Sequence, residues 1–505
     1  MKRRMTKDGT VRGSTSGNRR NFLKASALAA GYGVWVATGN REVALAQQEA
    51  NDKLNVAWVG VGGKGAGDAD QVAKVANLVA VCDTDEKIAN GKADAHDKDG
   101  KKPKVYNDWR KLLDEMGKEI DAVGVSVPDH NHTIIAVHAM KMGKHVYCQK
   151  PLTHSVAESR VMRETANEHK VVTQMGNQGT ASPGLRTGVE AIRSGMLGTV
   201  RAVHVWTNRP IWPQAPTVME WPKAQPTPEN INWDVWLGPA PEHPYNKEYA
   251  SFNWRGYWDF GTGALGDMGC HTFNLPYMAL KLTVPTRVKG VCADLNPVTY
   301  PAWATVQYHM PEREQMPPVL VTWYEGHFGY LEKRRNNRSG RDEPYQLKNL
   351  PPLALFKGQT PSQSGSLTVG DKATLYSPQD YGASWKVLSN DGEVLLDYDE
   401  KKGVVSGKAP DETLPRFPDT RKNKTEAPRD DDNMKLEWAN AIKGKGKTMS
   451  NFNYATQLVE FMLLGNVAIR VPGQPLDWDS KNMTISNDTN ADKYLKTEYR
   501  SGWSL

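Results

Sequence analysis

The chain has 505 residues, of which 39% are hydrophobic and 24% are charged, a composition typical of a folded protein long enough for two domains. Its formal net charge of +7 arises in residues 1–46, where nine Lys and Arg side chains accompany only two acidic ones, so the remainder is formally neutral. Because binding to nucleic acids and anionic membranes needs clustered basic side chains, this balance excludes both as partners of the folded body.

The N-terminal segment resembles a twin-arginine export signal. The pair Arg19-Arg20 precedes Asn-Phe-Leu-Lys, an apolar stretch covers residues 25–36, and Ala44-Leu45-Ala46 suits cleavage by signal peptidase. The apolar stretch is too short to serve as a membrane-spanning anchor. We therefore expect residues 1–46 to be a signal peptide, the twin-arginine translocase to be a partner during export, and the mature protein to be periplasmic without stable membrane insertion.

Between residues 52 and 175, short apolar runs alternate with helix-like stretches, as in repeated βαβ units around a parallel sheet. The pattern predicts an α/β domain over residues 52–175 with a doubly wound parallel sheet of the Rossmann type, which binds nucleotides. Its strands are expected in the apolar runs 54–60, 78–83, 121–128, 145–150 and 171–175.

From residue 176 onward, strand-like stretches follow one another with few helices between them, which favours one large, open, mainly antiparallel sheet. We therefore predict a second, α+β domain over residues 176–505, with a tryptophan-rich insertion at 206–258 and a charged, proline-rich surface loop at 408–432. Its strands are expected at 199–207, 287–295, 304–309, 319–325 and 366–376.

The first apolar run leads directly into a Gly-x-Gly-x-x-Gly turn, and a helix is expected after it. Glycines in this pattern let a pyrophosphate approach backbone N–H groups at a helix N-terminus, where the helix dipole favours negative charge. The second run ends at Asp83, near the position from which an acid binds the adenosine ribose, and this acid favours NAD over NADP because it would repel a 2′-phosphate. The predicted cofactor contacts here are Gly60, Gly62, Gly63, Lys64, Gly65 and Asp83.

Two later strand ends carry polar residues that should face the same edge of the sheet, in the segments 128–132 and 149–151. These segments resemble the Pro-x-x-x-His turn and the Glu-Lys-Pro motif of the Gfo/Idh/MocA family (glucose-fructose oxidoreductase and inositol dehydrogenase), although Gln149 stands where the motif has Glu. A metal site at His130 and His132 is not expected, because no third ligand is apparent. The resemblance implies further cofactor contacts at Pro128, Asn131, His132, Gln149 and Lys150.

A third match lies in the second domain, where a glycine-rich segment from Gly261 ends in Asp267-x-x-x-His271. The i, i+4 spacing places both side chains on one helix face, and His can take a proton near neutral pH. Together with the Lys-Pro motif, the resemblance implies Lys150, Asp267 and His271 as catalytic residues. The alternative is an Asp that caps a helix and a His that is buried for structural reasons.

The predicted insertion is rich in aromatic residues, with seven tryptophans between Val205 and Trp258. Such rings can stack on the apolar faces of a sugar while polar neighbours bind its hydroxyl groups. The alternative is that the rings pack the insertion's own core or an oligomer interface. We expect a carbohydrate site that includes Asn177, Arg209, Asn253, Trp254, Tyr257 and His271, with Asn208 and Arg255 as further polar neighbours.

The resemblance covers the chain from Leu54 onward and implies an NAD(P)-dependent oxidoreductase, with NAD preferred, that acts on a hydroxyl or ketone of a sugar or polyol. By this hypothesis His271 removes the hydroxyl proton, Lys150 stabilises the alkoxide, and Asp267 orients or tunes the imidazole. Export implies a tightly bound cofactor, since no free NAD pool is expected outside the cytoplasm. The family also implies a homo-oligomer, a dimer or a tetramer.

Two alternatives of function stay open at the level of the sequence. One is a redox-neutral, NAD-dependent glycoside hydrolase or lyase, which would use the same residues for transient oxidation of a sugar carbon. The other is a non-catalytic periplasmic sugar-binding protein that keeps the fold, against which the joint presence of Lys150, Asp267 and His271 argues.

Overall fold

The computed structural model describes residues 53–505 except 99, 251, 294, 336–341 and 418–429, and residues 54–505 form one compact unit. The predicted export signal at 1–46 and the middle of the predicted surface loop lie outside the described residues. Among the described helices, none combines the length and the apolar character that a bilayer-spanning segment requires.

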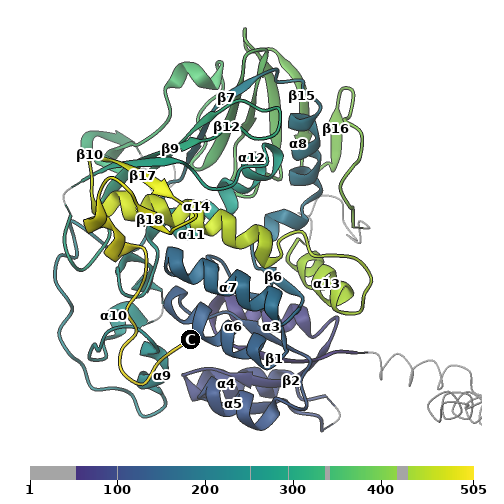
Figure 1. Ribbon diagram of the computed structural model, residues 1–505, viewed down its shortest axis with the longest axis vertical. Helices are drawn as coiled ribbons and strands as arrows, with labels where there is room; N and C mark the ends of the chain where they lie inside the picture. Colours follow the sequence, from purple (N-terminus) through teal and green to yellow (C-terminus); the bar gives the residue numbers. More distant parts are fainter. Residues whose placement is uncertain (1–52, 99, 251, 294, 336–341, 418–429) are drawn as a thin grey trace, which may run out of the picture. The chain divides into compact units, whose positions relative to one another are not determined.

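The first domain is built on a six-stranded parallel sheet with the strand order β3-β2-β1-β4-β5-β6 (Figure 1). Alternate residues of β1 belong to two different hydrophobic clusters, Ala57 and Val59 to one and Val56 and Trp58 to the other, so both faces of the sheet are covered. The prediction of a doubly wound sheet is confirmed. Its elements are β1 (Asn55–Val59), α3 (Gly63–Val72), β2 (Asn77–Cys82), α4 (Glu86–Ala95), β3 (Lys104–Tyr106), α5 (Trp109–Met116), β4 (Ala122–Val125), α6 (Asp129–Lys141), β5 (His145–Cys148), α7 (Val156–Glu168) and β6 (Thr173–Met175).

The second domain is built on a twelve-stranded sheet, in which β7 and β10 are parallel and the other pairs are antiparallel. The predicted large, mainly antiparallel sheet is therefore confirmed. Its strands are β7 (Val200–Trp206), β8 (Arg287–Cys292), β9 (Trp303–Met310), β10 (Val319–Arg335), β11 (Asp342–Lys348), β12 (Gly365–Gly370), β13 (Ala373–Ser377), β14 (Trp385–Ser389), β15 (Val394–Asp399), β16 (Val404–Ser406), β17 (Pro475–Asp479) and β18 (Thr484–Ile485).

Two strand predictions need correction. The single strand predicted at 366–376 is a hairpin, because Gly370 ends β12 and the chain turns over Asp371 and Lys372 before β13 begins. The apolar runs also miss β3, because this strand is three residues long, lies at the sheet edge and buries none of its side chains. Neither feature leaves a signal in hydrophobic periodicity.

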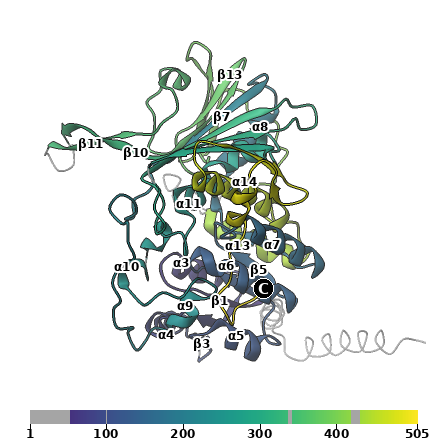
Figure 2. The same cartoon turned by 60° about the vertical axis from the view of Figure 1, so that its left-hand side comes forward.

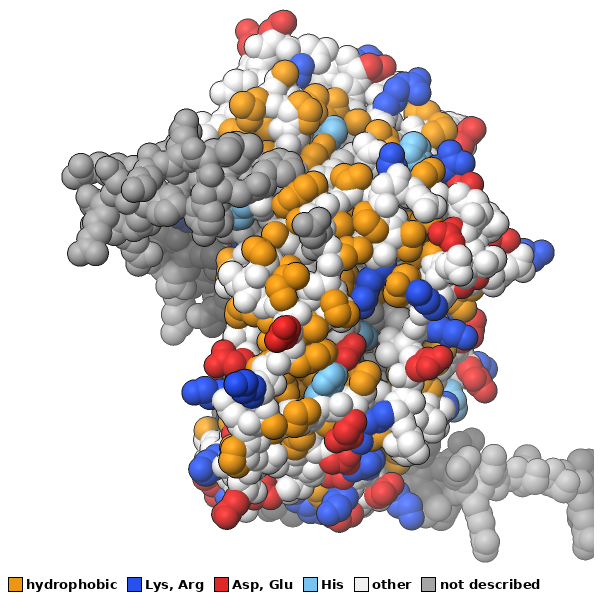
Figure 3. Space-filling model, turned by 90° about the vertical axis from the view of Figure 1, so that its left-hand side faces the viewer, with side chains coloured by type: hydrophobic (Ala, Val, Ile, Leu, Met, Phe, Trp, Pro, Cys, Tyr) orange, Lys and Arg blue, Asp and Glu red, His pale blue; other side chains and the backbone are white. Residues whose placement is uncertain are grey.

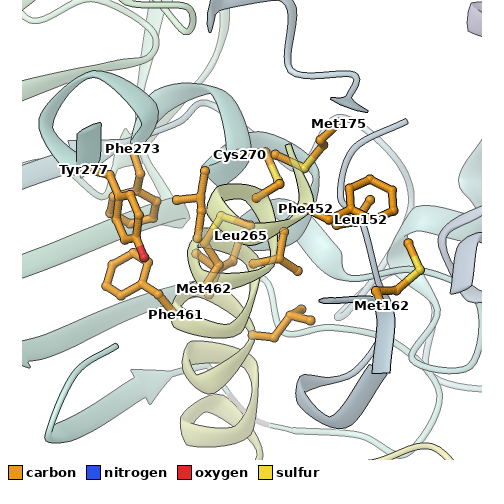
Figure 4. Close-up of a cluster of buried hydrophobic side chains, with 14 of the residues drawn as sticks. Leu152, Met162, Met175, Leu265, Cys270, Phe273, Tyr277, Phe452, Phe461 and Met462 are labelled. Carbon is orange, nitrogen blue, oxygen red and sulfur yellow. The ribbon is translucent and has the colours of Figure 1, made fainter. Parts of the chain in front are cut away.

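Helix α14 (Phe452–Arg470) lies in the core that joins the two domains. Figure 4 shows Phe461 and Met462 of this helix among side chains from both domains, with Leu265 and Cys270 beside them and Leu152 nearby. These residues belong to one continuous buried cluster, in which each large apolar side chain contributes about 1.5–3 kcal/mol by burial. The cluster holds α11 (Gly263–Thr272) in place relative to the end of β5. The other helices of the second domain are α8 (Pro183–Arg193), α9 (Trp233–Leu237), α10 (Lys247–Ala250), α12 (Asn274–Ala279) and α13 (Asp430–Ile442).

Two buried histidines at the start of α6 connect it to its neighbours. His130 Nδ1 lies 3.1 Å from the carbonyl oxygen of Phe260, and His132 Nδ1 lies 2.6 Å from that of Pro151. Burial lowers the pKa of each histidine to about 4. Neutral His132 therefore donates through Nδ1 to the segment after β5, and neutral His130, whose Nε2 lies 3.0 Å from the carbonyl oxygen of Trp236, donates one hydrogen bond to either Phe260 or Trp236. These contacts join the turn after β4 to the segments before α11 and after β5.

We predict that these histidines make the fold sensitive to acid between about pH 6.5 and pH 4. Their pKa is depressed in the folded state, so the unfolded chain binds more protons in this window and stability falls as the pH falls. Each histidine should cost about 2 kcal/mol of unfolding free energy between pH 7 and pH 5. Urea unfolding at the two pH values measures this loss. His130→Gln should reduce the loss, whereas His309→Gln, at an exposed position, should leave it unchanged; equal losses in both variants would contradict the assignment.

Candidate active site

The glycine turn lies where β1 meets α3 and admits no side chains at two of its positions. Gly60 has φ +81°, and a Cβ there would lie 2.2 Å from the backbone oxygen of Ser126. A Cβ on Gly65 would lie 2.0 Å from the oxygen of Gly60. The N-cap of α3, Gly62, places no side chain over the helix N-terminus. The turn thus offers uncapped backbone N–H groups to an anion, as the predicted pyrophosphate site requires.

A cavity of about 640 Å³ opens at the carboxyl ends of β1, β2 and β4. Ligands bind at this edge of a doubly wound sheet, at the point where the strand order reverses. Among the predicted cofactor contacts, those that line the cavity are Gly60, Gly62, Gly63, Lys64, Gly65, Asp83, Pro128, Asn131, Gln149 and Lys150. His132, which is 1% exposed, is not among the lining residues. It instead contacts the carbonyl oxygen of Pro151, just after β5.

Asp83 contacts the glycine turn as well as the cavity. It accepts hydrogen bonds from the backbone N–H groups of Val61 at 2.9 Å, Gly62 at 3.2 Å and Asp85 at 3.1 Å. Burial raises the pKa of this carboxyl group. An ionised Asp has acceptor capacity beyond these three bonds, so the side chain can still bind ribose hydroxyls. The glycine turn, the uncapped helix and this acid together fit a dinucleotide.

The tryptophan-rich insertion covers part of the same cavity. Val235, Trp236, Phe252, Trp254 and Arg255 all line it, opposite residues of the first domain. The insertion docks beside α4, where Figure 2 places α9. Two backbone hydrogen bonds hold it there, from Asn232 N to Thr84 O at 2.8 Å and from Glu86 N to Asn230 O at 3.0 Å. A dinucleotide in this cavity would therefore be enclosed from both domains.

Most aromatic rings of the insertion pack against one another. Trp233 and Trp236 stack with ring centres 4.5 Å apart, and Trp221 stacks on Tyr257 at 5.2 Å. Tyr257 is 2% exposed within this cluster. The interpretation of these rings as a sugar platform is therefore corrected, because other rings already cover their faces; Trp254 is the predicted aromatic substrate contact that lines the cavity. The face of the molecule in Figure 3 shows hydrophobic side chains among polar ones. The large exposed hydrophobic residues of the insertion are Ile211, Met219 and the cavity-lining Phe252.

The remaining predicted substrate contacts lie apart from the cavity lining. Asn177 is fully buried, donates to Cys270 O at 3.4 Å and accepts from Ser450 Oγ at 2.6 Å, so its amide is engaged within the core. Arg209 and Asn253 are not among the cavity-lining residues of the described chain. Their substrate contacts stay predictions.

Lys150 and Arg255, which line this cavity, both contact Asp267, which lies behind the lining. Lys150 Nζ donates to Asp267 Oδ1 and to its backbone oxygen, both at 2.8 Å, and Arg255 Nε donates to Oδ1 at 3.1 Å. Burial alone would raise the pKa of Asp267, but the positive charges of Lys150 and Arg255 outweigh it and hold the pKa well below its usual range. Asp267 is thus a carboxylate that fixes the Lys150 ammonium group.

His271 lies one turn after Asp267 on α11 and is 4% exposed. Its Nδ1 is buried without a hydrogen-bond partner. Its ring packs edge-to-face with the ring of Tyr381, with the two ring centres 4.8 Å apart. Burial, and then the charge of Lys150, hold the pKa of His271 well below its usual range. Of the two expected roles of Asp267 toward the imidazole, the structure supports tuning through its charge, because its side chain accepts hydrogen bonds from Lys150 and Arg255 instead of orienting His271.

Several residues at the site were not predicted from sequence. Asp129 lines the cavity, accepts a hydrogen bond from Thr262 Oγ1 at 2.6 Å, and has a pKa that burial raises to about 7. Its place directly after the Pro128 strand end was an available signal. Gln149 Nε2 donates to Asp68, a residue of α3 that no motif includes. No group of three or more side chains suited to hold a metal ion occurs among the described residues.

Two models of one oxidoreductase family match the chain in tandem. Residues 54–177 match the NAD-binding Rossmann fold of the Gfo/Idh/MocA family, and residues 187–313 match its C-terminal alpha/beta domain. The predicted family and the predicted NAD-binding domain are therefore confirmed.

Curated relatives match over shorter segments. A levoglucosan dehydrogenase of Pseudarthrobacter phenanthrenivorans is 29% identical over 94 residues, which cover 19% of this chain and 24% of that protein. An inositol 2-dehydrogenase of Salmonella typhimurium is 31% identical over 153 residues, or 29% of this chain and 44% of that protein. A glycosyl hydrolase family 109 protein of Akkermansia muciniphila is 34% identical over 122 residues, or 23% and 25%. The chain thus spans less than half the length of these relatives.

Solved structures share the fold over nearly their whole length. An inositol dehydrogenase homolog of Azotobacter vinelandii, in complex with NADH and myo-inositol, has a TM-score of 0.57 at 15% identity and covers 84% of this chain and 98% of its own. A levoglucosan dehydrogenase in complex with NADH and levoglucosan has a TM-score of 0.54 at 14% identity, with 84% and 99% covered. By its motifs and by the tandem matches to both domain models, the chain belongs to the Gfo/Idh/MocA family of oxidoreductases.

Proposed function

We propose that the protein is an NAD-dependent oxidoreductase that acts on a hydroxyl or ketone group of a sugar or polyol. The observation that carries this proposal is that Lys150, which lines the cavity of the NAD-binding domain, pairs with the buried Asp267, one helical turn before a neutral, buried His271. The relatives named for levoglucosan and inositol dehydrogenases support a polyol as the substrate class.

The glycine turn and Asp83 would hold NAD, which would supply the hydride acceptor for oxidation of a carbinol carbon. The His271 imidazole is neutral at physiological pH because its pKa is low, so it can accept the proton of the substrate hydroxyl group. The ammonium group of Lys150 stabilises the negative charge that develops on the same oxygen. Asp267 and Arg255 hold that ammonium group in place, and in the reverse direction the same groups protonate a ketone as it is reduced.

The protein should retain its cofactor rather than exchange it freely. The insertion lines the cavity together with the first domain and is hydrogen-bonded to it at Thr84 and Glu86, which supports slow release of a bound dinucleotide. Retention agrees with the sequence of residues 1–46, from which we infer export by the twin-arginine translocase to the periplasm after the cofactor is bound. We also infer a homo-oligomer, a dimer or a tetramer, because the family resemblance implies one.

A second candidate is a redox-neutral, NAD-dependent glycoside hydrolase or lyase. The likeness to glycosyl hydrolase family 109 proteins favours it, and the same Lys150 and His271 would serve a transient oxidation. Release of an aglycone without net NADH distinguishes this activity from net oxidation. A non-catalytic sugar-binding protein is the third candidate, and the buried charge pair of Lys150 with Asp267 argues against it, since such a pair is costly unless it is used.

We predict that Lys150→Ala and His271→Ala each lower kcat by about 10²–10⁴-fold, the usual contribution of a positioned acid or base. The measurement is NADH formation on a panel of polyols and anhydrosugars, alongside aglycone release from aryl glycosides. Lys281→Ala, which removes an exposed ion pair with Glu314, is the control and should leave kcat unchanged. Full activity in Lys150→Ala would refute the proposed site.

We predict that the protein purified without added cofactor carries close to one NAD or NADH per chain, released by denaturation and identified by mass and absorbance. Asn230→Ala removes the hydrogen bond of Asn230 Nδ2 to Asp85 Oδ1 (2.8 Å) and should speed the loss of nucleotide during dialysis. Asn390→Ala, which removes a hydrogen bond within the second sheet domain, should retain nucleotide like the wild type. A chain that carries no nucleotide and binds none on addition would exclude the proposed function.

A further inference from the structure

A buried carboxylate of α3 lies outside every predicted site and yet contacts the active-site strand. Asp68 is 0% exposed. Its hydrogen bonds come from Gln149 Nε2 at 2.8 Å, Ser126 Oγ at 2.9 Å and Lys435 Nζ at 2.5 Å, and Lys64 Nζ lies 3.2 Å away. Four groups converge on one carboxylate, which uses nearly all the acceptor capacity of an ionised Asp.

Lys435 is the counter-ion of Asp68 and belongs to α13, 367 residues later in the sequence. Its side chain is 0% exposed. Besides Asp68 it donates to Tyr147 Oη at 3.1 Å, and its ammonium group lies 4.4 Å from the centre of that ring. Charges excluded from water persist only when they are paired and hydrogen-bonded, and this pair meets both conditions.

The charge of Asp68 fixes the orientation of the Gln149 side chain. Burial alone would raise the pKa of Asp68, but the ammonium groups of Lys435 and Lys64 outweigh it and lower the pKa. The ionised carboxylate can only accept hydrogen bonds, so the Gln149 amide must direct Nε2 toward it and Oε1 away from it. Oε1 then accepts from the backbone N–H of Lys150 at 3.3 Å.

Gly176 limits the freedom of the same amide. A Cβ on Gly176 would lie 2.7 Å from both Cδ and Oε1 of Gln149, so the backbone after β6 packs directly against the amide plane. Gln149 is 5% exposed and lines the cavity next to Lys150. The network therefore directs Oε1 of Gln149 away from Asp68 and toward the backbone N–H of Lys150. In this way it also fixes the backbone conformation at Lys150.

We propose that Asp68 and Lys435 are positioning residues of the active site. Asp68 carries a buried negative charge, and Lys435 is its counter-ion. Together they hold the Gln149 side chain, and through it the backbone of Lys150, at the cofactor cavity. The Glu of the family's Glu-Lys-Pro motif would carry this charge itself. Here the charge resides on Asp68, one helix away, and a neutral amide stands beside it. The catalytic part of this inference rests on the proposed function.

The geometry explains why a Glu cannot simply replace Gln149 in this chain. A carboxylate at that position would lie within about 3 Å of the Asp68 carboxylate, and two like charges at that separation do not both ionise in a dry site. Moving the charge, rather than adding one, restores the balance: with Asn at position 68 and Glu at position 149, the two contacting side chains still carry one negative charge beside the Lys435 ammonium group, which also lies 3.7 Å from Asp431. This reciprocity makes the proposal testable.

The experiment compares Gln149→Glu, Asp68→Asn and the double variant Asp68→Asn/Gln149→Glu in the full chain, at a temperature where all three are folded. Dissociation constants for NAD are measured by calorimetry after nucleotide removal, with kcat, KM and the free energy of unfolding measured separately. Each single variant should weaken NAD binding or lower kcat by about tenfold or more. The double variant should return to within about threefold of the wild type.

Lys74→Met is the matched control. The ion pair of Lys74 with Asp432, 2.7 Å long, links the end of α3 to α13 as the pair of Lys435 with Asp68 does, but the Lys74 side chain is 53% exposed. The control should therefore leave NAD affinity and kcat at wild-type values.

Two results would overturn the inference alone. One is a double variant as impaired as Gln149→Glu, since the charge would then not be transferable. The other is an Asp68→Asn variant that loses stability but keeps wild-type NAD affinity and kcat, since the network would then only support the fold. A wild-type chain that binds no NAD would instead remove the proposed function and this inference with it.

Discussion

The ion pair between Lys150 and Asp267 is the contact on which the active site depends. It joins the end of β5 in the first domain to α11 in the second, across 117 residues of sequence. Lys150 donates both to the carboxylate and to the backbone oxygen of Asp267. These two hydrogen bonds fix the position of the ammonium group, and the carboxylate also balances its positive charge. The distance between the two residues is in turn set by the hydrophobic core around α14, which packs against both domains. The geometry of the proposed catalytic residues is therefore a consequence of the packing between domains.

The parts of the fold that the sequence predicts are those whose cause is local. The glycine turn is recognisable because Gly60 and Gly65 are sterically required within six residues, and the central strands are recognisable because each is a continuous apolar run. The contact of Asp68 with Lys435 spans 367 residues and leaves no pattern in either segment. Lys435 looks like an ordinary solvated residue of a charged helix, and only the fold shows that it is fully buried.

The aromatic insertion shows a second limit of prediction from sequence. A sequence reveals how many rings a segment has, but not which ring faces remain open once the segment has folded. Trp233, Trp236 and Tyr249 cover one another, so the aromatic content mostly builds a small core of its own. That core is nevertheless functional, because a rigid insertion can hold Trp254 and Arg255 over the cavity without the entropy cost that a flexible loop would incur.

The protonation states at the site follow from one charge acting on several neighbours. The ammonium group of Lys150 lowers the pKa of Asp267 by attraction, and by repulsion it adds to the effect of burial on His271. Asp129, for which burial outweighs the nearby cations, has a pKa of about 7. A cation, a carboxylate and a neutral base can therefore coexist within one desolvated site at neutral pH, and this separation of roles is what proton transfer coupled to hydride transfer requires. Because the charge of Lys150 adds to the effect of burial on His271, it helps to keep the imidazole neutral but also makes it a weaker base, while the same charge would stabilise an alkoxide. These opposed effects cannot be separated by removing Lys150 alone.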